Sequence, residues 1–148
     1  MKLGSLLLAA GALALAACAM APGRTAASDA TLQDAASLMV SIVQHGEGAD
    51  IPDLEAQLNE QAAASPSDPF VLMLTAQARR SLSDYSQDRA ERVRLRHTAL
   101  EEYDRAIAIS KPTDPPRTVM LNGQESEVDL KDLAQLRADL FHQVQTDR

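Results

Sequence analysis

The chain has 148 residues, a formal net charge of −7 at pH 7, no tryptophan and an aromatic content of 3%. This length fits one domain. The negative charge argues against binding to nucleic acid and against electrostatic adhesion to anionic lipid. With so few aromatic side chains, a core must consist of Leu, Val, Ile, Met and Ala, and an alanine-rich chain of this kind favours helix over sheet.

The N-terminal segment has the pattern of a secretory signal. Lys2 supplies a positive charge, and residues 3–15 are apolar apart from Ser5. About 13 apolar residues are too few for a bilayer core, which takes about 20 helical residues, but they suit the apolar part of a signal peptide. Small residues then precede the single cysteine of the chain.

The residues Leu15, Ala16, Ala17 and Cys18 resemble the lipobox of bacterial lipoproteins. The resemblance implies that residues 1–17 are cleaved and that Cys18 receives covalent acyl chains such as palmitate, which would anchor the protein to a membrane. A plain signal peptide or a buried free cysteine are the alternatives. The position of a lone cysteine at the expected cleavage point favours the lipobox.

This interpretation divides the chain into three parts. Lys2 is the only charged residue of the signal, so cleavage would make the net charge one unit more negative than −7. Residues 18–28 are small, polar and interrupted by Pro22-Gly23, and we expect a flexible tether there. Residues 29–148 are expected to form a single helical domain.

Apolar residues at spacings of three and four predict five helices, over residues 31–45, 52–64, 69–82, 88–110 and 130–145. The residues expected to cap them are Ser28 or Asp29, Asp50, Asp68 and Asp129. Val43, Ile107, Ala134 and Phe141 are assigned to inner helix faces. The third helix is apolar nearly all round, which predicts that it lies at the centre of the core.

Residues 118–128 change character, because Val119-Met120-Leu121 favours a strand and Asn122-Gly123 follows it. Asn-Gly between extended residues is a strong hairpin signal, since both turn residues tolerate positive φ. An ordered loop is the alternative. A hairpin here could expose an edge to a partner strand or cover one end of the helical core, and the second is favoured because a lone two-stranded ribbon is marginal in water.

Residues 99–107, Ala-Leu-Glu-Glu-Tyr-Asp-Arg-Ala-Ile, followed by Pro112, resemble the second helix of a tetratricopeptide repeat. Leu54, Leu58 and Pro66 repeat the pattern, with Gln61 where alanine is expected. The two prolines are 46 residues apart, against about 34 in the family, so the repeat would carry an insertion. The resemblance covers residues 31–112 and implies helical hairpins. The predicted fold is therefore mainly α, an antiparallel array of about five helices with one small β-hairpin before the last helix.

No pattern of residues predicts catalysis. The histidines, His45, His97 and His142, lie far apart and form no metal-binding spacing, so no metal is expected. The chain has no Gly-x-Ser-x-Gly motif and no glycine-rich phosphate loop. The carboxylate pairs Glu101-Glu102 and Glu125/Glu127 are expected to be solvated. The sequence therefore predicts neither an enzyme nor a cofactor.

Positive charge is concentrated in one part of this acidic chain, at Arg79, Arg80, Arg89, Arg92, Arg94 and Arg96. Arg89, Arg92 and Arg96 share a helix face and are the candidate residues for binding an acidic partner or a lipid phosphate. The alternative is a solvated face balanced by Asp84, Asp88 and Glu91. Pairing at helical spacings of three and four favours this alternative.

The resulting hypothesis is a lipoprotein that serves as a protein-interaction or scaffold module in the bacterial envelope, for example a secretion- or pilus-assembly accessory. By resemblance to enterobacterial lipoproteins, Ala19 in place of Asp after the cysteine implies the outer membrane, facing the periplasm. The expected partners are the membrane, through lipid on Cys18, and an envelope protein of unknown identity; neither nucleic acid nor metal is expected. A structural spacer and a carrier of a small amphiphile are the alternatives.

Overall fold

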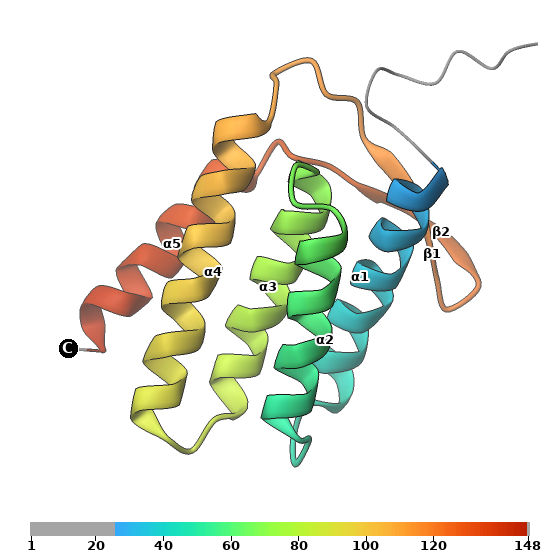
Figure 1. Cartoon of the computed structure of the whole chain (residues 1–148). Coiled ribbons are helices and arrows are strands. Elements are labelled where there is room, and N and C mark those ends of the chain that lie inside the picture. Colours follow the sequence, from blue (N-terminus) through green and yellow to red (C-terminus); the bar gives the residue numbers. More distant parts are fainter. Residues whose placement is uncertain (1–25, 148) are drawn as a thin grey trace, which may run out of the picture.

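Five helices and one β-hairpin make up residues 26–147, the part of the chain that the computed structural model describes (Figure 1). In chain order the elements are α1 (Ala26–His45), α2 (Ile51–Ala64), α3 (Pro69–Tyr85), α4 (Arg89–Ile109), β1 (Arg117–Leu121), β2 (Gln124–Val128) and α5 (Leu133–Thr146). The predicted fold class is confirmed, since the domain is mainly α and the hairpin precedes the last helix.

Helix α3 forms the centre of the domain, as its apolar sequence predicts. It packs most extensively against α4 and also contacts α1 and α2, whereas α5 packs against α4. Successive helices from α1 to α4 run in opposite directions (Figure 1). Every residue from Phe70 to Ala76 is buried. Burying a large aliphatic side chain contributes about 1.5–3 kcal/mol, so this run supplies much of the drive to fold.

Aspartate side chains cap three of the helices in the described part of the chain by hydrogen bonds. The side chain of Asp50 accepts a hydrogen bond from the backbone N–H of Asp53 at 3.1 Å, and Asp68 accepts one from Phe70 at 3.0 Å. Both predicted caps are confirmed. Asp88 caps α4 in the same way. Each cap satisfies a backbone donor that the first helical turn leaves unpaired.

The first and last helices begin at different residues from those predicted. Helix α1 starts at Ala26, so Ser28 and Asp29 lie inside it and do not cap it, and the last three residues of the expected tether are helical. Long-range contacts favour this extra turn, because the Ser28 hydroxyl donates to Asp68 at 2.7 Å. Helix α5 starts at Leu133 with Asp132 before it, whereas Asp129 accepts from the N–H of Lys131 in the preceding turn.

Three large apolar residues assigned to inner helix faces are exposed, as is the small Ala134, which the sequence also assigns to one. The exposed fraction is 50% for Val43, 40% for Ile107 and 38% for Phe141. Each directly follows a buried residue in the sequence and therefore points about 100° away from it around the helix. The Phe141 ring instead lies beside the Arg137 guanidinium, 5.1 Å from the ring centroid.

The predicted β-hairpin is present and covers part of the helical core. Leu121 pairs with Gln124 across Asn122 and Gly123, whose φ values of 52° and 78° are those a tight two-residue turn requires. Val119 and Val128 are buried against the helices. The expectation that the hairpin is packed on the core is confirmed, and the ordered-loop alternative is excluded.

The residues that carry the resemblance to tetratricopeptide repeats lie on the buried side of α4. Ala99, Tyr103 and Ala106 are all fully buried, and Pro112 follows the end of the helix. Small residues at such positions allow close helix packing, which many helical arrays share. Membership of the repeat family therefore stays a prediction.

Candidate functional site

The predicted lipid-attachment residues, Leu15, Ala16, Ala17 and Cys18, lie outside the described residues, as does the signal segment before them. Lipidation of Cys18 therefore stays a prediction from the sequence. Within residues 26–147, no helix is both long enough and apolar enough to cross a bilayer.

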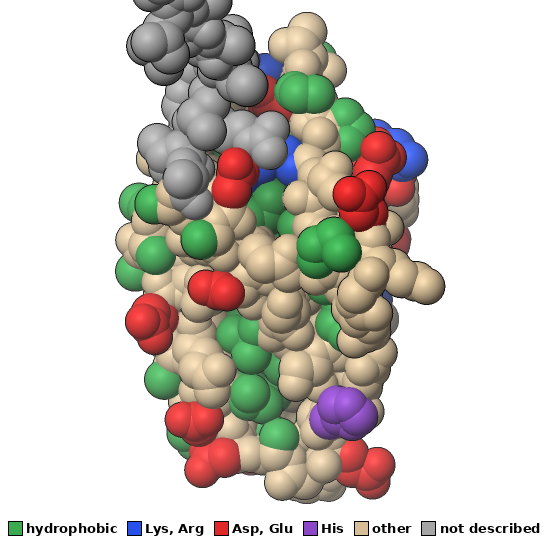
Figure 2. All heavy atoms as spheres, turned by 90° about the vertical axis from the view of Figure 1, so that its right-hand side faces the viewer, with side chains coloured by type: hydrophobic (Ala, Val, Ile, Leu, Met, Phe, Trp, Pro, Cys, Tyr) green, Lys and Arg blue, Asp and Glu red, His purple; other side chains and the backbone are tan. Residues whose placement is uncertain are grey.

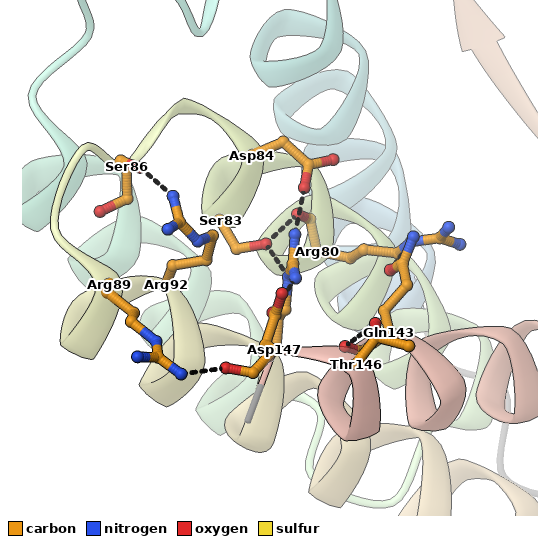
Figure 3. Close-up of polar contacts among 10 residues, drawn as sticks. Arg80, Ser83, Asp84, Ser86, Arg89, Arg92, Gln143, Thr146 and Asp147 are labelled. Atoms are coloured by element: carbon orange, nitrogen blue, oxygen red, sulfur yellow. Dashed lines mark hydrogen bonds and ion pairs between the residues drawn. The ribbon is translucent and has the colours of Figure 1, made fainter.

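The arginines predicted to bind a partner contact residues of their own chain, and Figure 3 shows this for Arg89 and Arg92. Arg96 is 8% exposed, and its guanidinium donates to Ser83 at 3.0 Å and to Asp84 at 2.7 Å. It also forms an ion pair with Asp147, just after α5. The expectation of a solvated position is therefore wrong for Arg96, because the turn between α3 and α4 and the end of α5 enclose it.

The other two arginines of this trio lie at the rim of the same cluster. Arg89 donates to the backbone carbonyl of Asp147 at 2.5 Å, and Arg92 donates to the carbonyl of Ser86 at 2.9 Å (Figure 3). These contacts join α4 to the end of α5 and to the α3–α4 turn. Binding of an acidic partner by the trio stays a prediction, but the geometry supports a structural role.

A buried ion pair joins α3 to α4 near the middle of the domain. Arg79 is 1% exposed and donates from Nε to Glu102 Oε2 at 3.0 Å. Its Nη2 donates to Asn59 at 2.7 Å, and its Nη1 lies 3.7 Å from Glu55 Oε1, both on α2. The expectation that Arg79 belongs to a solvated face is wrong, since three helices surround it.

Glu102 is buried as well, which corrects the expectation that the Glu101-Glu102 pair is solvated. Burial raises the pKa of Glu102 above its usual 4.5, and the neighbouring Arg79 guanidinium offsets part of this effect. Desolvation disfavours the charged carboxylate, whereas the opposite charge favours it. Glu101, the adjacent residue, is exposed.

A cleft of about 300 Å³ lies between α2 and α4, with the Arg79–Glu102 pair in its wall. Its other lining residues are Asn59, Ala62, Ala63, Pro66, Thr98, Glu101 and Arg105. Arg105 donates to the carbonyl of Pro66 at 3.0 Å. Two arginines and two glutamates balance the charge of the lining, so the cleft favours water or a small polar group over an acyl chain.

The cleft holds no hydroxyl–histidine pair among its described lining residues. Its only hydroxyl belongs to Thr98, which donates to the backbone carbonyl of Arg94 at 3.2 Å and has no histidine beside it in the lining. His45, His97 and His142 are exposed. Over residues 26–147, no three potential metal ligands gather in one place. The described part of this site can bind by hydrogen bonding and charge.

The hairpin is attached to the helices by a third buried arginine, Arg117. Arg117 Nη1 donates to Asp68 at 2.6 Å, and Nη2 donates to Asp29 at 2.5 Å. The guanidinium carbon also lies 5.3 Å from the centroid of the Phe70 ring. Asp68 therefore caps α3 and holds β1 at the same time, which places the hairpin beside the first turns of α1.

Sequence reasoning missed the burial of Arg79, Arg96 and Arg117, although a signal for the Arg79–Glu102 pair was present. Glu102 lies three residues after Ala99 and four before Ala106, so it shares their buried face. A carboxylate on such a face needs a positive partner. Arg79, within the helix predicted to be most buried, was the obvious candidate.

Comparisons with protein families, curated proteins and solved structures found no match to this chain.

Proposed function

We propose that this protein is a lipid-anchored lipoprotein of the outer membrane, facing the periplasm, and that its helical domain serves as a protein-interaction module. The observation that carries the anchor is the run from Leu15 to Cys18 after about 13 apolar residues, with no other cysteine in the chain. Two or three acyl chains on Cys18 would exceed the two-signal requirement for stable membrane attachment.

The described domain favours interaction over chemistry as its mode of work. Its most enclosed charged groups, Arg79, Glu102, Arg96 and Arg117, are bound to one another or to carboxylates of the same chain. Such groups hold helices together and leave the outer surfaces to engage a partner. An envelope accessory of this kind would act through shape and charge at the end of its lipid anchor.

The anchor is tested by replacing Cys18 with serine in a Gram-negative host fed an alkyne analogue of palmitate. The parent chain should incorporate the fatty acid and sediment with membranes. Cys18→Ser should incorporate none and lose the membrane fraction, whereas Ala17→Ser, which keeps a small residue before the cysteine, should behave as the parent. Sedimentation of unlabelled Cys18→Ser protein with membranes would overturn the anchor.

Sorting is tested separately by Ala19→Asp. In an enterobacterial host, this change should move the acylated protein from the outer to the inner membrane on a sucrose gradient. Ala21→Asp adds the same charge two residues later and should leave the location unchanged. Equal movement of both variants would show a general charge effect and contradict the proposed sorting signal.

The interaction role is tested by crosslinking the acylated protein in membranes and identifying what co-purifies. A reproducible envelope protein that is lost when the helical domain is unfolded by substitution would support the module. Recovery of only this chain would favour the structural-spacer alternative.

A further inference from the structure

A glutamine side chain closes one edge of the β-hairpin. Gln33 of α1 donates from Nε2 to the carbonyl of Met120 at 2.7 Å and accepts from the N–H of Met120 at 2.7 Å. A side-chain amide offers one donor and one acceptor, so it pairs with Met120 as a neighbouring strand would. The outer edge of β1 is therefore occupied at this residue.

This contact also fixes the direction of the backbone groups on β2. Residues of an antiparallel pair alternate between pairs that exchange hydrogen bonds and pairs that do not. Because the N–H and C=O of Met120 point to Gln33, the Met120–Glu125 pair does not exchange them, and neither does the Thr118–Glu127 pair. The N–H and C=O groups of Glu125 and Glu127 therefore point outward, away from β1.

The outer edge of β2 is open in the described part of the chain. Glu125 and Glu127 are exposed, and no group of residues 26–147 outside the hairpin hydrogen-bonds to their backbone. The hairpin itself is held firmly by Arg117 and Gln33, so this edge is presented in a fixed orientation. Unpaired edges of this kind can add a strand from another chain, with main-chain hydrogen bonds supplying affinity.

The charge on this edge indicates which strand fits. The side chains of Glu125 and Glu127 lie on the same, outer face of the hairpin, beside the half-exposed Met120. Pairing β2 with a second copy of itself would place these carboxylates opposite the same carboxylates, which is destabilising. Acidic side chains are also spread over the α1 and hairpin side of the molecule (Figure 2).

We infer that the outer edge of β2 is a docking site for an extended, basic segment of another protein, with Lys or Arg at alternate positions. The segment would add a third strand, exchange backbone hydrogen bonds with Glu125 and Glu127, and set its basic side chains beside the two carboxylates. This deepens the proposed function by naming the partner class, and it rests on the domain acting as an interaction module.

The test uses the acylated protein in mild detergent and the acetylated, amidated peptide Thr-Lys-Val-Lys-Val-Lys-Thr. Calorimetry should detect binding, and amide hydrogen exchange at Glu125 and Glu127 should slow by about tenfold or more on saturation, because these amides become hydrogen-bonded. The amides of Val119 and Ser126, which already face each other across the hairpin, should change little.

Two comparisons separate strand addition from charge attraction. The same peptide N-methylated at the alternate amides that face β2 keeps its charge but cannot donate, and it should lose binding about tenfold or more. The double change Glu125→Lys and Glu127→Lys should weaken the basic peptide about tenfold and favour a matching Glu peptide. Glu47→Lys with Glu60→Lys alters the net charge equally on exposed residues elsewhere and should have a small effect.

Equal binding of the N-methylated peptide, or unchanged exchange at Glu125 and Glu127, would overturn the inference. Failure of the basic peptide to bind would overturn it as well, and would favour a role for the two glutamates in preventing strand pairing. The peptide comparison needs no altered protein, so misfolding of the Lys variant would not obscure it. Binding to the domain does not require lipid on Cys18, so a failed anchor and a failed docking site give different results.

Discussion

Arg79 and Arg117 are both buried, yet their surroundings differ in a way that determines how much each matters. Each guanidinium has two carboxylate neighbours and one buried nitrogen without a hydrogen bond within residues 26–147. The main partner of Arg79, Glu102, has a side chain only 5% exposed. The partners of Arg117, Asp29 and Asp68, have side chains 36% and 11% exposed.

The difference lies in what remains when the arginine is removed. Loss of Arg79 leaves a carboxylate whose side chain is only 5% exposed, whereas loss of Arg117 leaves two carboxylates that are more exposed to water. A buried charge without its partner is far more costly than the net benefit of the pair. The exposure of the carboxylate partner, more than the burial of the arginine, therefore determines how much stability is lost when the arginine is removed.

The largest expected effect follows from Arg79→Met. This change should lower the free energy of unfolding by about 3–5 kcal/mol, because the buried Glu102 carboxylate loses its ion-pair partner. Urea unfolding followed by circular dichroism measures it. Combining Arg79→Met with Glu102→Met should recover most of the loss, since well-packed apolar side chains can replace a buried ion pair. A double variant as unstable as the single one would contradict the assigned cause.

Arg117→Met should cost less, about 1–3 kcal/mol, because hydrogen bonds to charged groups are lost but the aspartates remain partly hydrated. The damage should be local, with amide exchange faster in β1 and β2 than in α3. Exchange measured by mass spectrometry together with urea unfolding checks this. The neighbouring change Thr118→Met, at an exposed position, is the control. A loss equal to that of Arg79→Met would remove the distinction between the two arginines.

The two tyrosines make the same comparison for neutral groups, because the cost of removing a hydroxyl also depends on whether it has a hydrogen-bond partner. The hydroxyl of Tyr103 is buried without a hydrogen-bond partner in the described structure, whereas that of Tyr85 donates to the carbonyl of Val43 at 3.0 Å. Tyr85→Phe should therefore lose about 1 kcal/mol, and Tyr103→Phe should be neutral or gain up to about 1 kcal/mol. Thermal unfolding of the two variants side by side measures the difference. The opposite order would contradict this dependence.

The smallest expected effect concerns Glu55, at the outer rim of the Arg79 cluster. A hydrogen bond from Arg94 lowers the pKa of Glu55 below its usual 4.5, despite partial burial. A lowered carboxyl pKa means that the stabilisation is present above pH 4.5 and is lost as the pH falls through the folded-state value.

Glu55→Gln should therefore cost about 0.5 kcal/mol at pH 7, since Arg94 is exposed, and the difference from the parent should vanish toward acid pH. Urea unfolding at several pH values measures it. Glu60→Gln, at an exposed position on the same helix, should show no comparable trend. A difference that grows at low pH would contradict the assigned ion pair.

Much of the fold could be predicted from the sequence because its signals are local. Helical spacing gave the five helices, Asp50 and Asp68 marked helix starts, and Asn122-Gly123 marked the hairpin. The predicted helix starts were wrong where contacts with other parts of the chain determine the first helical residue. The first turn of α1 is supported by Asp68 and Arg117, which lie far along the chain. At α5, Asp129 turns the chain before Asp132 begins the helix.

The candidate site was harder to predict, because the spacing of arginines along a helix does not show which of them are buried. Arg79 and Arg96 look like members of one solvated group, yet each is enclosed by helices that meet only in the folded domain. The Gln33–Met120 contact joins residues 87 positions apart. Such contacts cannot be recognised in the sequence, because the pattern around a glutamine that bonds to a strand does not differ from that around a glutamine exposed to water.

The closeness of the hairpin to the start of α1 limits how far from the membrane a partner can bind. Arg117 and Met120 contact the first turns of this helix, and Ala26 comes only eight positions after Cys18 in the sequence. Eight residues extend at most about 29 Å. With lipid on Cys18, a chain that pairs with β2 must meet it within a few nanometres of the bilayer, so membrane-embedded or membrane-bound proteins would have the best access to it.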